Sequence, residues 1–226
     1  MSSRFDVSNE SERTAGITAA RFALQNQRCV VLPTDTVYGI GADAFSAQGV
    51  SMLLAAKGRS RTMPPPVLIA QLATMDGLAT DIPEAARALA EAFWPGALTL
   101  ILHAQPSLTW DLGETKGTVA LRVPNDAMAL ELLGQTGPLA VSSANRTGNP
   151  AALSAEAAEA QLGESVDVYL SDGERGTGEQ TLASTIVDAT LSPPRVVRQG
   201  AISLAELRAV VPEILGFGES TPSQDA

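Results

Sequence analysis

The sequence has little of the chemistry that many enzymes rely on, because it contains one cysteine, Cys29, and one histidine, His103. A single cysteine excludes a disulfide framework within the chain. Any Ser-His-Asp or Cys-His site would have to use His103, which ends an apolar stretch where a structural or surface role is the usual one. One residue of each kind also does not make a zinc site of the usual kind. The sequence therefore does not indicate a hydrolase, a thiol enzyme or a zinc protein.

Long apolar runs are also absent. No run approaches the roughly 18–20 residues that cross a bilayer, and the longest candidate, residues 97–102, has the length of a buried strand. Residues 1–13 are polar and mixed in charge, which does not fit a secretory signal. We therefore expect a cytoplasmic protein.

Positive charge is scarce, because 15 lysines and arginines stand against 25 aspartates and glutamates, for a net charge of −10. Proteins that bind nucleic acid without specificity do so by neutralising phosphates, and an acidic chain does this poorly. Chemistry on phosphates would need a local basic patch. The sequence offers one at Lys57, Arg59 and Arg61.

What is present fits a folded α/β domain. Apolar residues make up 45% of the chain and charged residues 18%, a profile typical of a folded protein rather than a disordered one. Helical and strand patterns alternate along the chain. The expected helices cover residues 11–27, 47–56, 83–93, 126–133 and 204–210, with another that begins at Ser154, and the expected strands cover 28–32, 67–70, 98–102, 118–121, 139–142, 166–170, 184–187 and 195–198.

The domain boundaries follow from composition. No linker divides the chain, so we expect one domain over residues 13–212, a flexible N-terminus over 1–12 and a disordered polar tail over 213–226. The glycine-rich segment 171–180 is predicted to be mobile, and its composition suggests a lid.

Two familiar nucleotide-binding motifs do not apply. Residues 39–44 match the spelling GxGxxA, but the motif does not directly follow its strand, and no acidic residue lies about 20 residues further on. A GxxxxGK[ST] motif is absent, which excludes a P-loop.

Four polar segments adjoin expected strands, over residues 33–41, 57–69, 120–124 and 141–150. Lys57 and Arg59 could converge on an anion, or they could be a solvated helix end. Arg122 lies within an apolar strand and needs a partner, which could be a structural acid or the carboxylate of a ligand.

For the other polar positions, too, the sequence allows both a structural and a functional interpretation. The small residues 142–145 could let a ligand approach the backbone closely, or they could form a capped turn. Arg198 ends another strand, where the simplest interpretation is surface charge.

Together and in order, these segments resemble the threonylcarbamoyl-AMP synthase family, the YrdC-like proteins. The resemblance covers residues 15–205 and rests on PTDTVYGIG, KGR, FWPGALTLIL, ALRVP, SSANRTG and the ending from ASTIVD to VVRQGAI. The chain lacks the extra C-terminal domain of the long family form, so it resembles the short form.

The resemblance implies a YrdC-like single domain of the α/β class, with a twisted, open mixed sheet and flanking helices around a concave, positively charged cleft. It implies condensation of L-threonine, bicarbonate and ATP to threonylcarbamoyl-AMP and diphosphate. Mg²⁺ would be held mainly by the ATP phosphates, with no metal site built from the protein. Proteins of the threonylcarbamoyl-transfer complex would then pass the group to an adenosine of tRNA, with no membrane involved.

The resemblance also assigns roles to residues. The catalytic set is Lys57, Arg59, Ser143 and Asn145. The ATP-binding set is Arg59, Met63, Thr118, Ser143, Ala151 and Arg198. The threonine-binding set is Thr36, Leu68, Arg122, Val141 and Ser184. Met63 and Leu68 depart from the family pattern, which often has Lys or Asn and His there, and Arg61 is the candidate replacement for the charge missing near Met63.

Two other functions remain open from the sequence. One is a YrdC-like paralogue that uses a different carbamoyl acceptor. The other is a non-catalytic module that binds RNA. The KxR element (Lys57 and Arg59) and the SxN element (Ser143 and Asn145) favour the synthase. The net charge disfavours a general RNA binder.

Overall fold

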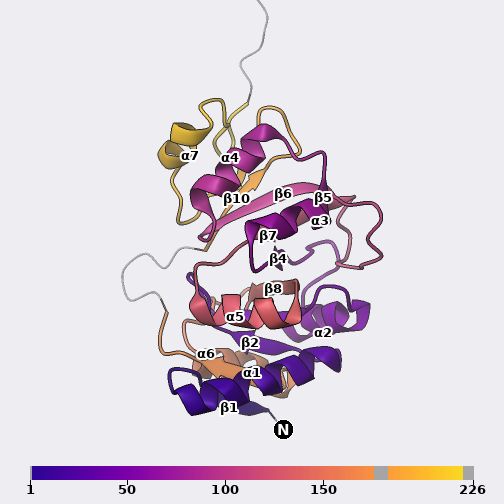
Figure 1. Cartoon of the computed structure of the whole chain (residues 1–226), viewed down its shortest axis with the longest axis vertical. Helices are drawn as coiled ribbons and strands as arrows, with labels where there is room; N and C mark the ends of the chain where they lie inside the picture. The colour runs from indigo at the N-terminus through magenta and orange to yellow at the C-terminus, as the bar shows by residue number, and fades with distance from the viewer. Residues whose placement is uncertain (1, 176–182, 221–226) are drawn as a thin grey trace, which may run out of the picture.

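The computed structural model describes residues 2–175 and 183–220. Helices and strands alternate around one mixed sheet (Figure 1), which confirms the predicted α/β class. The helices are α1 (Glu10–Gln25), α2 (Ala47–Lys57), α3 (Met75–Leu78), α4 (Glu84–Phe93), α5 (Ala127–Thr136), α6 (Ala155–Leu162) and α7 (Leu204–Val210). None of the described helices is both long and apolar enough to span a membrane.

The strands pair in the order β1-β9-β2-β3-β8-β4-β7-β6-β10-β11, and β5 adds to β6. Their bounds are β1 (Ser3–Asp6), β2 (Val30–Leu32), β3 (Gly39–Asp43), β4 (Val67–Leu68), β5 (Ala79–Thr80), β6 (Leu98–Ala104), β7 (Thr118–Arg122), β8 (Leu139–Ser143), β9 (Val168–Ser171), β10 (Thr185–Asp188) and β11 (Arg195–Arg198). Parallel pairs such as β4–β7 and β6–β10 occur beside antiparallel ones such as β3–β8 and β6–β7. The sheet is therefore mixed, as expected.

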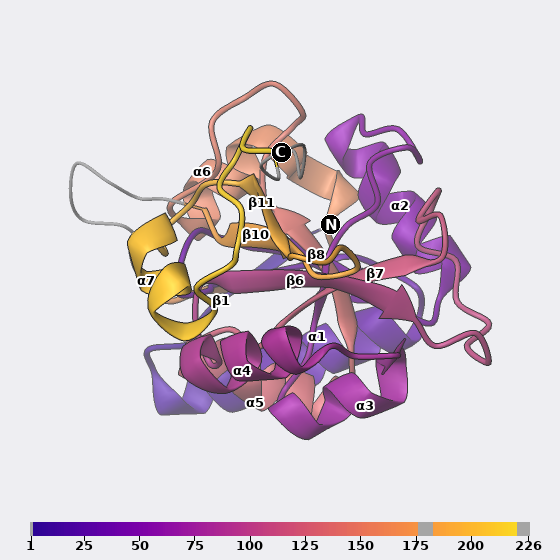
Figure 2. The ribbon, with the colours of Figure 1, turned by 90° about the horizontal axis from the view of Figure 1, so that it is seen from above.

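Helices cover both faces of the sheet. Seen from above, α3, α4 and α5 lie on one side and α2 and α6 on the other (Figure 2). Alternate residues of a strand reach opposite faces, so Val30 and Leu32 join the core cluster of α1 and α5, whereas Val31 joins the larger cluster on the other side. Two apolar layers thus hold the sheet in place.

Local signals explain several element boundaries. The Asn9, Ser46, Asp126, Ser154 and Ser203 side chains each accept a backbone N–H in the first turn of the helix that follows, which satisfies a donor that the helix itself leaves free. The end of α5 differs from the prediction, because Gly134 continues the helix and Gly137 follows its last residue.

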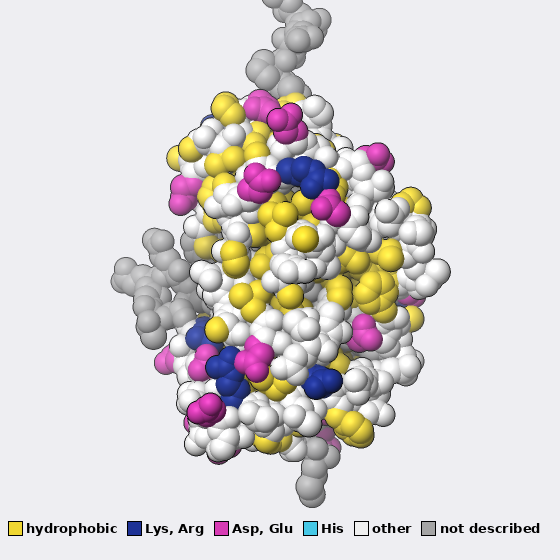
Figure 3. All heavy atoms as spheres, viewed as in Figure 1, with side chains coloured by type: hydrophobic (Ala, Val, Ile, Leu, Met, Phe, Trp, Pro, Cys, Tyr) yellow, Lys and Arg dark blue, Asp and Glu magenta, His cyan; other side chains and the backbone are white. Residues whose placement is uncertain are grey.

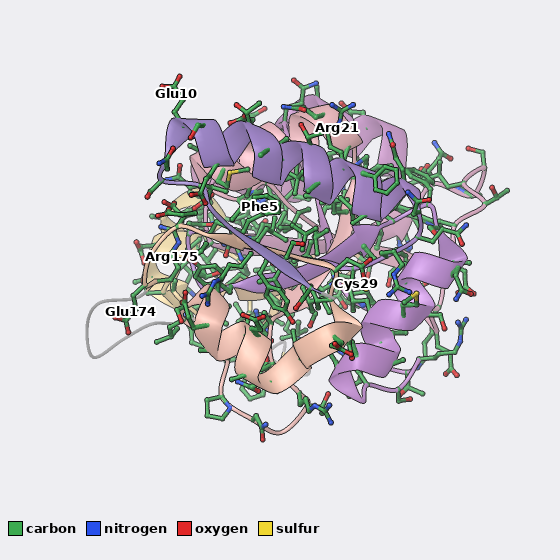
Figure 4. All side chains as sticks on the ribbon, turned by 90° about the horizontal axis from the view of Figure 1, so that it is seen from below. Phe5, Glu10, Arg21, Cys29, Glu174 and Arg175 are labelled. Carbon is green, nitrogen blue, oxygen red and sulfur yellow. The ribbon has the colours of Figure 1, made fainter. Side chains whose placement is uncertain are left out.

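The N-terminus is not a flexible extension, contrary to the prediction. Residues Ser3–Asp6 form β1, which pairs in parallel with β9. Phe5 packs beside α1 (Figure 4), at the point where a Cβ on Gly16 would come within 2.9 Å of the Phe5 Cβ. One partly buried aromatic side chain and the ladder to β9 fix a segment whose other residues are polar.

The start of the tail is ordered as well. Ile214 is buried, and the Val196 N–H donates to the Leu215 carbonyl at 2.8 Å. The predicted disordered tail is therefore wrong for residues 213–220, and residues 221–226 lie outside the described part. The segment predicted to be mobile, 171–180, is described only up to Arg175, where the Arg175 N–H donates to the Leu153 carbonyl at 2.7 Å.

Candidate active site

A cavity of about 330 Å³ opens on one face of β6 and β7. Leu98, Leu100 and Leu102 turn toward the core. The alternate residues Thr99 and Ile101 line the cavity. In β7, Thr118, Ala120 and Arg122 line the cavity, whereas Leu121 belongs to the core cluster and Val119 belongs to that cluster and borders the cavity as well. The period of two thus explains how an arginine occurs inside an apolar strand.

Most of the site residues predicted from the sequence meet at this cavity. The lining includes Thr36, Arg59, Leu68, Thr118, Arg122, Val141, Ser143, Ala151, Ser184 and Arg198. These residues come from β4, β7, β8 and β11 and from segments that lie next to β3, β10, α2 and α6. The fold therefore gathers positions that are far apart in the chain. Lys57, Met63 and Asn145 do not line the cavity.

Three guanidinium groups share the cavity wall, those of Arg59, Arg122 and Arg198. Burial is the main cause that lowers the pKa of each. The charges of Arg122 and Arg59 lower the pKa of Arg198 further, which means that both of these cations lie within electrostatic reach of Arg198. A planar guanidinium offers paired donors to a carboxylate or a phosphate.

Protein acceptors hold Arg122 in place. Its Nε donates to the Gly96 carbonyl at 2.9 Å, one terminal nitrogen donates to Thr36 Oγ1 at 3.2 Å, and the other donates to Asp35 Oδ1 at 2.6 Å. The sequence left open whether Arg122 has an acidic partner within the chain, and the structure shows that Asp35 is such a partner. An arginine has five N–H donors, so donors remain for a ligand in the cavity.

Arg59 and Arg198 are each fixed by a serine. The Arg59 terminal nitrogen donates to Ser142 Oγ at 2.9 Å, and its buried Nε has no partner among the described residues. Arg198 donates to the Ser184 carbonyl at 2.6 Å and to Ser184 Oγ at 2.9 Å. Thr99 Oγ1 lies 2.8 Å from the same Ser184 hydroxyl. Arg198 is therefore part of the cavity wall and not merely surface charge.

Lys57 lies behind the cavity wall. Its ammonium group donates to the Ser143 carbonyl, to the Asn145 carbonyl at 2.7 Å and toward Asn145 Oδ1 at 3.4 Å. The Asn145 amide group in turn donates to the Arg146 and Asn149 carbonyls. Lys57 and Asn145 thus fix the turn after β8, from which Ser143 reaches the cavity. Burial lowers the pKa of Lys57 to about 8, with a smaller contribution from the charge of Arg59.

The two positions that depart from the family pattern separate in space. Leu68 is 3% exposed and lines the cavity, whereas Met63 is 43% exposed and lies outside it. The Arg61 guanidinium, predicted to stand in for a charge near Met63, pairs with Asp111 at 2.7 Å.

Several cavity residues were not singled out from the sequence. Leu112, Thr115 and Val119 lie in none of the polar segments or family motifs. The others were noted only within those segments, and they are Thr34, Val37, Tyr38, Gly39, Pro64, Pro65, Pro66, Thr99, Ile101, Ala120, Ser142, Ala183 and Ile186. Thr99 and Ala120 alternate with core leucines, so once the face of Arg122 is known the period of two predicts them. The prolines of 64–66 carry no such signal.

The lining residues suit anionic groups better than a metal ion. No aspartate or glutamate is among the described residues that line the cavity, and no cluster of three or more metal-binding side chains occurs in the described part of the chain. Mg²⁺ prefers oxygen ligands, mostly carboxylates and substrate phosphates. A magnesium ion held by side chains of this chain does not fit the cavity.

The chain matches known proteins over nearly its full length. The family model for Sua5, YciO and YrdC, described as telomere recombination, matches residues 23–200. A protein of Mycobacterium leprae, provisionally named as a threonylcarbamoyl-AMP synthase, is 50% identical over 218 residues, which cover 95% of this chain and 98% of that protein. The threonylcarbamoyl-AMP synthase of Bacillus subtilis is 35% identical over 209 residues, which cover 91% of this chain and 60% of that protein.

A solved structure shares the fold. The crystal structure of Pyrococcus abyssi Sua5 complexed with L-threonine aligns with a TM-score of 0.85 and 32% identity, and the alignment covers 98% of this chain and 64% of that chain. The chain therefore spans less than two thirds of the Bacillus and Pyrococcus proteins. A family model that matches more than half of the chain, and a 50% identical relative covered almost from end to end, show that this protein belongs to the Sua5/YciO/YrdC family.

Proposed function

We propose that this chain is a threonylcarbamoyl-AMP synthase, which condenses L-threonine, bicarbonate and ATP to threonylcarbamoyl-AMP and diphosphate. The observation that carries the proposal is that Arg122 shares one cavity with Arg59 and Arg198. Relatives from Pyrococcus abyssi and Bacillus subtilis bear the name of this enzyme, and the related Pyrococcus structure was solved with L-threonine.

Arg122 binds the carboxylate of threonine in this proposal. Its remaining N–H donors suit a carboxylate, and Thr36 Oγ1, which accepts from Arg122 at 3.2 Å, stands beside the amino acid. Ser184 lines the same cavity and also holds Arg198, while Leu68 and Val141 supply apolar surface for the threonine methyl group.

Arg59, Arg198 and the turn at Ser143 face the nucleotide. The unpartnered Nε of Arg59 is a donor that a phosphate oxygen would satisfy. Thr118 and Ala151 line the remaining nucleotide side. Lys57 and Asn145 act through the turn after β8 rather than by contact. Mg²⁺ enters with ATP as part of the substrate, since its ligands there are phosphate oxygens.

The bonds that form and break in this reaction are those of the substrates, and the protein takes little part in them covalently. The neutral amine of threonine adds to the carbon of carbon dioxide derived from bicarbonate and loses a proton, which leaves a carbamate. A carbamate oxygen attacks the α-phosphorus of ATP, and diphosphate leaves. Holding both substrates side by side and stabilising the charge that builds on the phosphates supply the rate. This role fits a cavity of arginines and hydroxyls without histidine or cysteine in its described lining.

The proposal also covers the proteins that use the product and the compartment in which the reaction takes place. The product is a mixed anhydride, so a transfer complex formed by other proteins consumes it and modifies tRNA, and the chain itself contacts tRNA only indirectly. We place the reaction in the cytoplasm, where ATP and tRNA occur together.

The test is an assay with purified protein, MgATP, bicarbonate and labelled threonine. We expect diphosphate and a labelled AMP derivative to form together, and both to vanish when threonine or bicarbonate is omitted. Product with another amine acceptor but none with threonine would instead identify a paralogue with a different carbamoyl acceptor. Absence of turnover together with RNA retained at physiological salt would identify an RNA-binding module.

A further inference from the structure

The carboxylate of Asp35 touches the Arg122 guanidinium outside the cavity lining. Asp35 Oδ1 lies 2.6 Å from the Arg122 terminal nitrogen, and the two side chains are 14% and 8% exposed. By comparison, the side chains of the Arg87–Asp76 pair, at 2.7 Å, are 45% and 53% exposed. Arg122 lines the cavity and Asp35 is not among the described residues that do. The two side chains of this largely buried ion pair therefore face different surroundings.

The loop that carries Asp35 is itself held rigidly. The Thr34 hydroxyl donates to the Val37 carbonyl at 2.6 Å, and the Thr36 N–H donates to Thr34 Oγ1 at 3.2 Å. Asp35 and Thr36 then contact two different nitrogens of Arg122, and the Gly96 carbonyl takes the third. The guanidinium plane is thus fixed from three directions by one loop and one backbone carbonyl.

The negative charge of Asp35 also offsets the repulsion that Arg122 experiences inside the cavity. Arg59 and Arg198 share the cavity with Arg122, and the charges of Arg198 and Arg122 repel each other. A buried cation is stable only beside a partner of opposite charge, and Asp35 is the carboxylate in contact with Arg122. Without that carboxylate, the Arg122 side chain would be free to turn away from the two other cations.

We propose that Asp35 is a positioning residue for the amino-acid substrate, which acts by holding Arg122 aimed into the cavity. The inference rests on the proposed function, because it takes Arg122 as the group that binds the threonine carboxylate. Asp35 does not touch the substrate, so it sets the affinity for threonine and leaves the affinity for ATP and the chemical step nearly unchanged.

The test compares the Asp35→Asn variant with the wild type. Asparagine keeps the shape but removes the charge, and we expect the KM for threonine to rise about tenfold, or about 1.4 kcal/mol. The kcat and the KM for ATP should stay within about twofold of the wild type, since a charge-assisted hydrogen bond to Arg122 is the interaction removed. Binding of threonine methyl ester, which has no free carboxylate, should be unchanged by the substitution.

Matched variants separate positioning from stability. Asp76→Asn removes a carboxylate from an exposed arginine pair at nearly the same distance and should leave every parameter unchanged. Asp35→Asn should add nothing to the threonine KM when Arg122→Ala is already present. If Asp35→Asn does not fold, Asp35→Glu serves instead, and its retained carboxylate should give a smaller rise in the threonine KM.

The outcomes distinguish this inference from the proposed function. A lower threonine KM in Asp35→Asn would overturn the inference, because it would mean that Asp35 competes with threonine for Arg122. Equal changes for threonine and ATP would overturn it too. If the wild type makes no threonine-dependent product, the proposed function fails, and threonine binding measured by calorimetry then decides the inference alone. A wild type that binds no threonine would overturn both.

Discussion

Arg122 and Arg59 line one cavity, but they have different neighbours, so their removal should have different consequences. We expect Arg122→Ala to raise the KM for threonine about 100-fold and the KM for ATP far less, because a buried charged hydrogen-bonding group is lost. Arg59→Ala should lower kcat by about 100-fold, as the loss of a preorganised donor does. Steady-state kinetics on variants with wild-type circular dichroism make the comparison, with Arg87→Ala as an exposed control. Equal damage to both KM values in Arg122→Ala would contradict its assigned role.

Lys57 gives a second prediction for a single side chain. Burial lowers its pKa from 10.5 to about 8, so a titration followed by NMR of the Lys57 ammonium nitrogen should show a midpoint near 8. The unfolded chain then binds more protons than the folded one between these values, and the free energy of unfolding should rise with pH across that window. Lys57→Met should remove this rise. A midpoint near 10.5 would show that the ammonium group is solvated.

At the scale of elements, β3 shows how a strand can be built from glycine. A Cβ on Gly39 would lie 2.6 Å from Val141 Cγ1, and Val141 lines the cavity on the neighbouring strand β8. Because a valine side chain has little rotational freedom, Gly39→Ala should cost about 1–3 kcal/mol of stability and should also weaken threonine binding.

A second glycine provides the control for this prediction. Gly134 lies within α5, and a Cβ there would meet nothing within 4 Å. Alanine favours a helix over glycine by about 1 kcal/mol, so Gly134→Ala should stabilise the protein without changing activity. Thermal unfolding of both variants settles the matter, and a Gly39→Ala protein as stable as the wild type would show that β8 can move away.

For the molecule as a whole, the question is whether three clustered arginines make an RNA-binding protein. The face shown in Figure 3 carries lysine and arginine side chains in separate groups with acidic residues nearby, and the chain as a whole has a net charge of −10. Since affinity for nucleic acid comes mainly from neutralised phosphates, we expect no RNA retention at micromolar protein and physiological salt. Filter binding across a salt series tests this expectation, and a steep salt dependence with tight binding would refute it.

Much of this architecture could be predicted from local patterns. Pro33 ends the strand before it, Pro83 precedes α4, and Ser154 caps α6 through its hydroxyl, because each acts on its own few residues. β1 and β3 were missed for the opposite reason. β1 is a polar segment that becomes a strand only beside β9. β3 contains two glycines, which are typical of a loop, and it is a strand because it pairs with β2 and β8.

The sequence by itself determined the α/β class and the family resemblance. Most of the site residues that it singled out do line the cavity. The sequence could do so because helix caps, strand periods and short motifs are local. Only the tertiary structure decided that Arg122 pairs with Asp35, 87 positions away. It also decided that Lys57, which was expected to face the nucleotide, lies behind the turn after β8 and donates to the Asn145 carbonyl. Both depend on which strands become neighbours, and that choice is made by the packing of the whole sheet rather than by any segment of it.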